Sequence, residues 1–270
     1  MELSHIEYKL TSSINKNIFY ELSALVDADS LFYGVFDYNK TLVWAGHTSL
    51  SHTDQLKQEL LDNEIKIRKV KIGILNSQHT IIPNGEFNTD TIRDIVTHVN
   101  HIDQPEQYIY RSEYSVQHKL RVLYAVQKEV IRTLNAAFDN CQLIHVNFAQ
   151  VESTSNGGVT QDYTVRLCFY ESIFCLTIVD KEQLILCNTY DYSSNQDVLY
   201  FLGLAFERLG LDLSTQSVEV GGYVTHDGDL LSELKRYFGG IRYATGYIKS
   251  KLKSSEEHFH LPLYMISKCA

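Results

Sequence analysis

The chain has 270 residues, of which 44% are hydrophobic and 21% are charged, and its formal net charge is −9. These proportions are those of a folded globular protein, and the length favours two domains over a single core. The acidic balance argues against a nucleic-acid partner, because binding a polyanion requires a basic surface. No apolar run is long enough to form a membrane-spanning helix.

The cysteines and the N-terminus indicate a reducing compartment. The chain has five cysteines, an odd number, and none forms a C-x-x-C pair. The opening residues, MELSHIEYKL, lack the basic and apolar regions of a secretory signal. We therefore expect a cytoplasmic protein with reduced, mostly buried thiols and no metal site.

The first predicted elements are three antiparallel strands within residues 19–46. The apolar or alternating runs are 20–26, 31–36 and 41–45. They are separated by DADS and DYNK, and the Asp, Asn and Ser of these separators favour tight turns.

Helices and further strands are predicted from there to about residue 150. Residues 51–54 resemble a capping box at the start of a helix that carries Leu56 and Leu60. A second helix begins near Thr89, since apolar residues follow it at helical spacing. The remaining predicted elements are strands at 69–75, 81–82, 119–126 and 142–149, and a helix at 127–138.

The stretch STSNGG at 153–158 is the most linker-like in the chain, and it predicts a division into residues 1–155 and 156–270. Three strand-like runs between residues 164 and 190 open the second half. The elements predicted after them are a helix over 194–209 ended by Gly210, a strand at 217–222, a helix over 229–238, and the strand-like runs IRYATGYI and HLPLYMI.

The two halves can be overlaid. Phe32 and Leu42 are ten residues apart, as are Phe174 and Leu184, and each pair brackets a polar turn that contains an Asp. A meander, helix, strand and helix repeated at roughly 140 residues predicts a duplicated α/β protein with a cleft between its halves.

Several segments carry a resemblance to a known family: LVDADSLFYGVFDYNKTLVWAG, TIIPNGEFN, LRVLYAV, and LILCNTYDYSSNQDVLYFLGLAFERLGLDL followed by VEVGG. On these segments the chain resembles the uncharacterised bacterial family called domain of unknown function 3822. The resemblance implies an actin-like ATPase architecture, in which two ribonuclease-H-like mixed sheets are flanked by helices. Distant relatives of that family include pilus-assembly and cell-division adaptors.

Working members of this superfamily bind ATP and magnesium with a D-x-G turn between the first two strands of each half. Here the first turn is Asp27-Ala28-Asp29-Ser30 and the second is Glu171-Ser172. Neither contains the glycine that lets backbone amides approach a phosphate, and no lysine stands beside either turn. Turns rich in Asp, Asn and Ser also simply close hairpins. Asp27, Asp29 and Ser30 are therefore either ordinary turn residues or a degenerate phosphate loop.

A third superfamily element is a glycine pair that contacts adenine, and Gly221-Gly222 stands in the matching place after a strand. Glycines at a strand exit also serve sharp turns, so both interpretations stay open. Gly157-Gly158 is typical of a loop. His258-x-His260 lacks the further ligands that zinc would need, and no other catalytic motif occurs.

We therefore expect no catalytic residues, and a binding or scaffold protein that needs no cofactor. The alternative is a nucleotide-binding ATPase or kinase-like enzyme that uses ATP with magnesium. The predicted helix at 194–209 is apolar on more than one side, so Tyr200 and Phe201 either pack internally or contribute to self-association or a protein partner.

Overall fold

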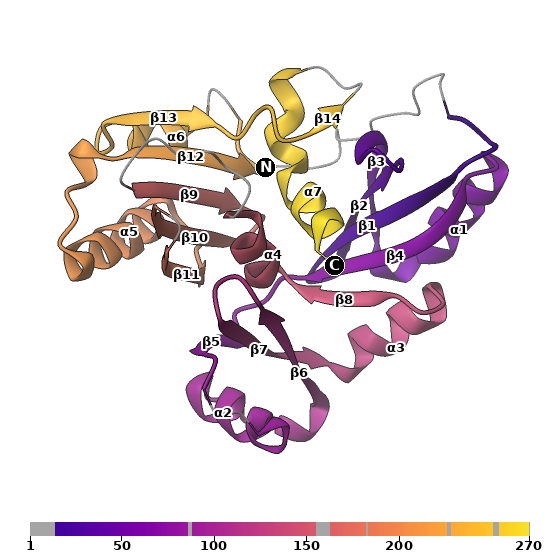
Figure 1. Ribbon diagram of the computed structural model, residues 1–270, viewed down its shortest axis with the longest axis horizontal. Helices are drawn as coiled ribbons and strands as arrows, with labels where there is room; N and C mark the ends of the chain where they lie inside the picture. The colour runs from indigo at the N-terminus through magenta and orange to yellow at the C-terminus, as the bar shows by residue number, and fades with distance from the viewer. Residues whose placement is uncertain are drawn as a thin grey trace.

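The structure is a computed structural model that describes residues 14–85, 88–154, 163–181, 183–225, 228–250 and 254–269. Within these ranges the strands form two large sheets and one small sheet, and helices cover them (Figure 1). No helix in the described part of the chain is long and apolar enough to cross a membrane.

The first large sheet has the strand order β14-β3-β2-β1-β4-β8. Its strands are β1 (Phe19–Asp27), β2 (Ser30–Phe36), β3 (Thr41–Ser49), β4 (Lys66–Ile74), β8 (Gln142–His145) and β14 (Lys249–Ser250). β1 pairs antiparallel with β2 and parallel with β4, and β4 pairs parallel with β8. The predicted three-stranded meander is therefore confirmed.

The second large sheet has the order β11-β10-β9-β12-β13. Its strands are β9 (Tyr163–Phe169), β10 (Ile173–Asp180), β11 (Gln183–Asp191), β12 (Ser217–Gly222) and β13 (Gly240–Tyr243). Again an antiparallel meander lies beside two parallel strands. The shared order and directions confirm the duplicated architecture of two mixed sheets.

The helices in the described part of the chain are α1 (Thr53–Asp62), α2 (Ile92–Val99), α3 (Lys128–Ala137), α4 (Val146–Ser153), α5 (Asn195–Leu209), α6 (Asp229–Leu234) and α7 (Leu261–Lys268). Of these, α1 and α3 cover the outer face of the first large sheet, and α5 and α6 cover that of the second. Leu56 of α1 and Leu134 of α3 share an apolar cluster with Leu22 of β1. In the second half, Val198 of α5 and Leu231 of α6 pack with the strands of their own sheet.

The halves differ by an insertion between β4 and β8. It contains α2 and a three-stranded sheet of order β5-β7-β6. Its strands are β5 (His79–Pro83), β6 (Tyr108–Ser115) and β7 (Leu120–Gln127). Between the matching strands of the second half, β12 and β13, only α6 occurs. The sequence patterns did not predict β6.

Two helices, α4 and α7, lie between the two large sheets (Figure 1). The strand predicted at 142–149 is confirmed over β8 but is wrong from Val146 on, and the prediction of HLPLYMI as a strand is wrong. Val146 begins a helix directly after β8, and the run HLPLYMI forms most of α7. Each helix is buried on nearly all sides, so its apolar residues show no helical periodicity that would distinguish it from a strand.

The predicted capping box is also wrong. Ser49, not Ser51, accepts a backbone hydrogen bond at the start of a short 3₁₀ turn over Leu50–His52. α1 then continues from His52, whose side chain makes no capping bond, because the preceding turn already directs the chain into the helix. By contrast, Gly210 ends α5 in the left-handed conformation, as predicted.

An apolar core joins the two halves. Leu25 and Phe32 of the first sheet belong to the same buried cluster as Cys168 of the second, and Leu261 and Ile266 of α7 lie in it as well. The linker-like residues that suggested the division lie largely outside the described residues, so the division itself stays a prediction. The described cysteines are free thiols, and all except Cys141 are buried.

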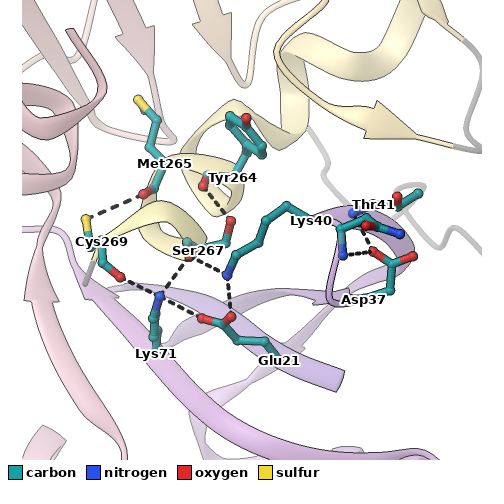
Figure 2. A network of polar contacts seen from close by, with 10 residues as sticks. Glu21, Asp37, Lys40, Thr41, Lys71, Tyr264, Met265, Ser267 and Cys269 are labelled. Atoms are coloured by element: carbon teal, nitrogen blue, oxygen red, sulfur yellow. Dashed lines mark hydrogen bonds and ion pairs between the residues drawn. The ribbon is translucent and has the colours of Figure 1, made fainter. Parts of the chain in front are cut away.

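Two lysines hold the C-terminal end of α7 on the first sheet (Figure 2). The Lys71 ammonium of β4 donates to the Ser267 carbonyl at 2.8 Å and pairs with Glu21 at 2.7 Å. The Lys40 ammonium donates to the same carbonyl at 2.7 Å and also pairs with Glu21. Cations are favourable there because the last carbonyls of a helix carry partial negative charge. We call this group of Glu21, Lys40, Lys71 and Ser267 the α7 anchor.

Candidate functional site

The turn between β1 and β2 meets the turn between β9 and β10 where the two halves face each other. The Asp27 carboxyl lies close enough to the backbone and the side chain of Glu171 for both to influence its pKa. Asp27 is buried, with 4% of its surface exposed, whereas Glu171 is exposed. The two turns that would hold phosphates in a nucleotide-binding relative therefore lie close together.

The surroundings of the Asp27 carboxyl favour its protonated, neutral form over its anionic form. Burial raises the pKa of Asp27 to about 6, and the Glu171 charge adds to this, while the Glu171 amide opposes it. Burial also raises the pKa of Tyr192 and Tyr223, again with a contribution from both carboxylates. Within the described residues, no lysine or arginine contributes to these three shifts. A phosphate placed here would meet negative charge without a compensating cation.

Aromatic rings from both halves fill the space around the two turns. The Phe32 ring of β2 lies 4.5 Å from the Tyr223 ring, which follows β12, and 4.7 Å from the His47 ring. Tyr223 also meets Tyr170 edge-on at 5.9 Å, and the Tyr192 hydroxyl donates to the Tyr170 carbonyl at 2.8 Å. Side chains of the protein itself thus occupy this part of the junction.

The other residues of the first turn lie differently. Asp27 pairs with Ser30 across the hairpin, and Ser30 is half-buried. Asp29 is exposed, and its carbonyl accepts a hydrogen bond from the Leu50 amide at 2.7 Å. Ala28 and Asp29 line a separate cavity of about 520 Å³, whose lining residues all come from the first half. The structure therefore does not gather Asp27, Asp29 and Ser30 around one open site.

Protein atoms also occupy the space next to both glycines of the predicted adenine-contacting pair. A Cβ atom on Gly221 would lie 2.6 Å from Leu261 of α7. Gly222 has φ +77°, and a Cβ atom on it would lie 2.0 Å from the Phe169 carbonyl oxygen. Glycine is required at position 222 by its φ and by the Phe169 backbone, whether or not adenine binds, whereas at position 221 a larger residue would have to displace the end of the Leu261 side chain.

These residues, as arranged here, do not fit a magnesium-bound nucleotide. The two turns lie close together, aromatic rings fill the space beside them, and Leu261 and Phe169 cover the glycine pair. The sequence identified both turns and the glycine pair but not their proximity to one another. Glu171 was seen only as a turn residue, and no local signal marks His47, Tyr192 or Tyr223 as its neighbours.

The structure also describes the surroundings of the histidine pair His258 and His260 and of the aromatic pair Tyr200 and Phe201. The ring Nε2 of His258 lies 2.8 Å from the Val224 carbonyl oxygen, and both His258 and His260 are buried. Among the residues that the structure describes, no group of three or more metal-ligating side chains occurs.

The ring of Phe201 stacks on Tyr190 at 4.7 Å, so Phe201 is partly packed, whereas Tyr200 is 64% exposed. Gly157-Gly158 lies outside the described residues.

Comparison with known proteins agrees with the architecture. A family model described as "Protein of unknown function (DUF3822)" matches residues 10–241. A search of curated proteins finds no match.

Solved structures with a similar fold include a protein of unknown function with an actin-like ATPase fold from Bacteroides thetaiotaomicron. It is 15% identical with a TM-score of 0.74, over 93% of this chain and 96% of that one. The PilM-PilN type IV pilus biogenesis complex is 11% identical with a TM-score of 0.61, over 92% and 96%. A ROK family glucokinase from Streptomyces griseus with glucose and AMPPNP is 10% identical with a TM-score of 0.45, over 92% and 97%. The likeness to the Bacteroides protein shows that the chain has an actin-like ATPase fold.

Proposed function

The chain belongs to the DUF3822 family of proteins of unknown function, and we propose that it is a non-catalytic binding or scaffold protein on an actin-like ATPase fold. The observation that carries this proposal is the proximity of Asp27 to Glu171. Where an ATPase would separate its two phosphate turns by a nucleotide, here the two turns lie close enough for their carboxylates to interact electrostatically.

The core between the halves supports the same proposal. Domains separated by a small polar interface move relative to each other by default, but a large apolar interface opposes such motion. Here Phe32, Cys168 and Leu261 pack in one buried cluster with residues of both halves. Opening the junction for a nucleotide would expose these side chains to water, at about 25 cal/mol for each Å² of apolar surface.

A protein partner is compatible with this fold. One of the similar structures is a complex of PilM with PilN, although at 11% identity the likeness extends to the fold alone. We propose that this chain also acts through contacts with a protein, either a partner or a second copy. A cytoplasmic location, expected from the sequence, is part of the proposal.

Thermal unfolding with ATP and magnesium tests the proposal. A ligand that binds only the folded state raises the melting temperature, by an amount that grows with the ratio of its concentration to Kd. We expect no shift with ATP and magnesium, and no phosphate release. A nucleotide-dependent shift, or ATP hydrolysis that survives purification and is lost in Asp27→Ala, would favour the ATPase or kinase-like alternative.

A further inference from the structure

Two strand edges face each other across a groove that is separate from the β1–β2 and β9–β10 turns. β11 is an edge strand of the five-stranded sheet, and β5 is an edge strand of the three-stranded sheet. The groove has a volume of about 700 Å³, and its walls include Leu184 to Thr189 of β11 and His79 to Pro83 of β5. The end of α2 at Val99 and the β6–β7 turn at Lys119 complete it.

Within the described residues, no backbone hydrogen bond joins β5 to β11. The outer side of an edge strand presents a row of N–H and C=O groups that can pair with another extended chain. Both edges therefore present hydrogen-bonding groups of the kind that hold a peptide in strand addition.

β11 lacks the features by which natural proteins protect such edges. Charged side chains, prolines and short length normally prevent pairing with other chains. From Leu184 to Tyr190, β11 reads LILCNTY, without a charge or a proline. The opposite edge of the same sheet, β13, has only four residues and carries Arg242. The sheet thus protects one edge and leaves the edge beside the groove open to pairing.

Side chains hold the two edges together at one end of the groove. His79 Nδ1 of β5 lies 3.2 Å from the Thr189 hydroxyl of β11. His79 Nε2 lies 2.6 Å from the Asn147 side-chain amide of α4. Burial lowers the pKa of His79 to about 4, so the ring stays neutral near pH 7. These contacts fix the separation of the strands before a ligand arrives, which lowers the entropic cost of binding.

The lining of the groove combines apolar side chains with neutral polar ones such as Thr80, Asn100 and Asn188, and it includes one lysine. Val99 is 52% exposed, although it is hydrophobic. Lys119 is exposed in the β6–β7 turn, and none of the lining residues is acidic, in a chain whose net charge is −9. The six residues Leu184 to Thr189 match about 20 Å of extended peptide.

We propose that the groove binds an extended peptide segment of a partner protein, which adds as a strand along β11 with an acidic residue near Lys119. This inference rests on the proposed binding function and names its site and the chemistry of its partner. Main-chain hydrogen bonds supply much of the affinity, and apolar side chains of the peptide contact the groove walls.

Selection of phage-displayed random peptides of about twelve residues, against the purified full-length chain, supplies the probe for the test. A selected peptide is synthesised with a fluorescent label, and its Kd is measured by anisotropy. Two further versions carry N-methyl groups on alternate residues, in one phase or the other. Each lost hydrogen bond costs about 1 kcal/mol, so removing three along one edge should weaken binding by at least tenfold in one phase or both.

A matched pair of charge reversals locates the peptide. Lys119→Glu should weaken binding about fivefold, since exposed charge pairs are worth up to about 1 kcal/mol. Lys181→Glu is the control, because Lys181 is also an exposed lysine with positive φ in a hairpin turn, but it does not line the groove. Amide hydrogen exchange across residues 183–191 should slow when the peptide binds.

Three outcomes would overturn the groove proposal. In the first, peptides bind but neither N-methyl phase nor Lys119→Glu changes Kd, so a binding function stands but its site lies elsewhere. In the second, no selected peptide binds more tightly than about 100 μM, which is too weak for a built site. In the third, β11 amides of the protein alone become protected as its concentration rises, which would show that a second copy occupies the edge. The ATP experiment is independent of all three.

Discussion

Two carboxylates, the half-buried Glu21 of the α7 anchor and the buried Asp27 of the β1–β2 turn, have opposite electrostatic surroundings. Burial raises the pKa of both. At Glu21, hydrogen bonds and charges from Lys40 and Lys71 outweigh burial and lower the pKa below its ordinary value. At Asp27 the nearby charge is that of Glu171, another carboxylate, and the pKa rises to about 6.

This difference shows how the chain uses its cations. In a nucleotide-binding relative, positive charge is needed beside the phosphate turns. Here Lys40 and Lys71 instead neutralise Glu21 and bond to the Ser267 carbonyl of α7. Glu21 lies near the start of β1, whereas the turn with Asp27 follows its end. These two lysines thus fix α7 on the first sheet. The Asp27 carboxyl, by contrast, titrates near pH 6.

The largest expected effect comes from removing one partner of the anchor. Lys71→Met keeps the length of the side chain but leaves the Ser267 carbonyl and Glu21 with fewer partners. Breaking a buried ion pair in this way should lower the free energy of unfolding by about 3–5 kcal/mol, measured by urea denaturation. Lys69→Met, two residues away on β4 and exposed, is the matched control and should change stability little. Equal stability of the two variants would contradict the role assigned to the anchor.

A smaller and opposite effect is expected at the Asp27 carboxyl. The folded-state pKa of Asp27, about 6, lies above its ordinary value of 3.8. Its contribution to stability is therefore fully present below pH 3.8 and is lost as the pH rises through about 6. Asp27→Asn stays neutral at every pH, so it should be more stable than the native chain at pH 8, by at most about 3 kcal/mol.

The same comparison at pH 4 provides the contrast. There the Asp27 carboxyl is mostly protonated in the folded state, and the advantage of Asp27→Asn should nearly vanish. Asp29→Asn is the control at both values, because Asp29 is exposed in the same turn. If the Asp27→Asn advantage were independent of pH, it would not come from the charge of the Asp27 carboxylate.

Much of the fold could be predicted from the sequence because turns and alternation are local signals. The segments around DADS and DYNK and the helical spacing of apolar residues in α2 carry enough pattern to place the first meander and a helix of the first half. β6 escaped prediction because Arg111 and Glu113 interrupt its apolar residues, and α4 and α7 escaped because burial between two sheets removes the polar side of a helix.

The candidate site was only half predictable for a related reason. The missing glycines of both turns can be read from the sequence, but the proximity of Asp27 to Glu171 involves residues far apart in the chain. Likewise, the edge position of β11 depends on the order of strands in the sheet, which no local pattern specifies. What the sequence gives is the chemistry of each turn, whereas the pairing of the turns is a property of the assembled halves.

The smallest expected effect concerns the backbone of the first turn. Ala28 has φ +50°, in the left-handed region, where a Cβ atom costs about 1–2 kcal/mol relative to glycine. The greater freedom of glycine in the unfolded chain offsets part of this gain, so Ala28→Gly should raise the free energy of unfolding by about 0.5–1 kcal/mol. Asp29→Gly, at a neighbouring position without positive φ, should instead lower it. Because Asp29→Gly also places a glycine at the third position of a D-x-G turn, thermal unfolding of that variant with ATP and magnesium separates two reasons for the expected lack of binding. A shift seen only in the variant would show that the absent glycine, rather than the proximity of Glu171, keeps nucleotide out.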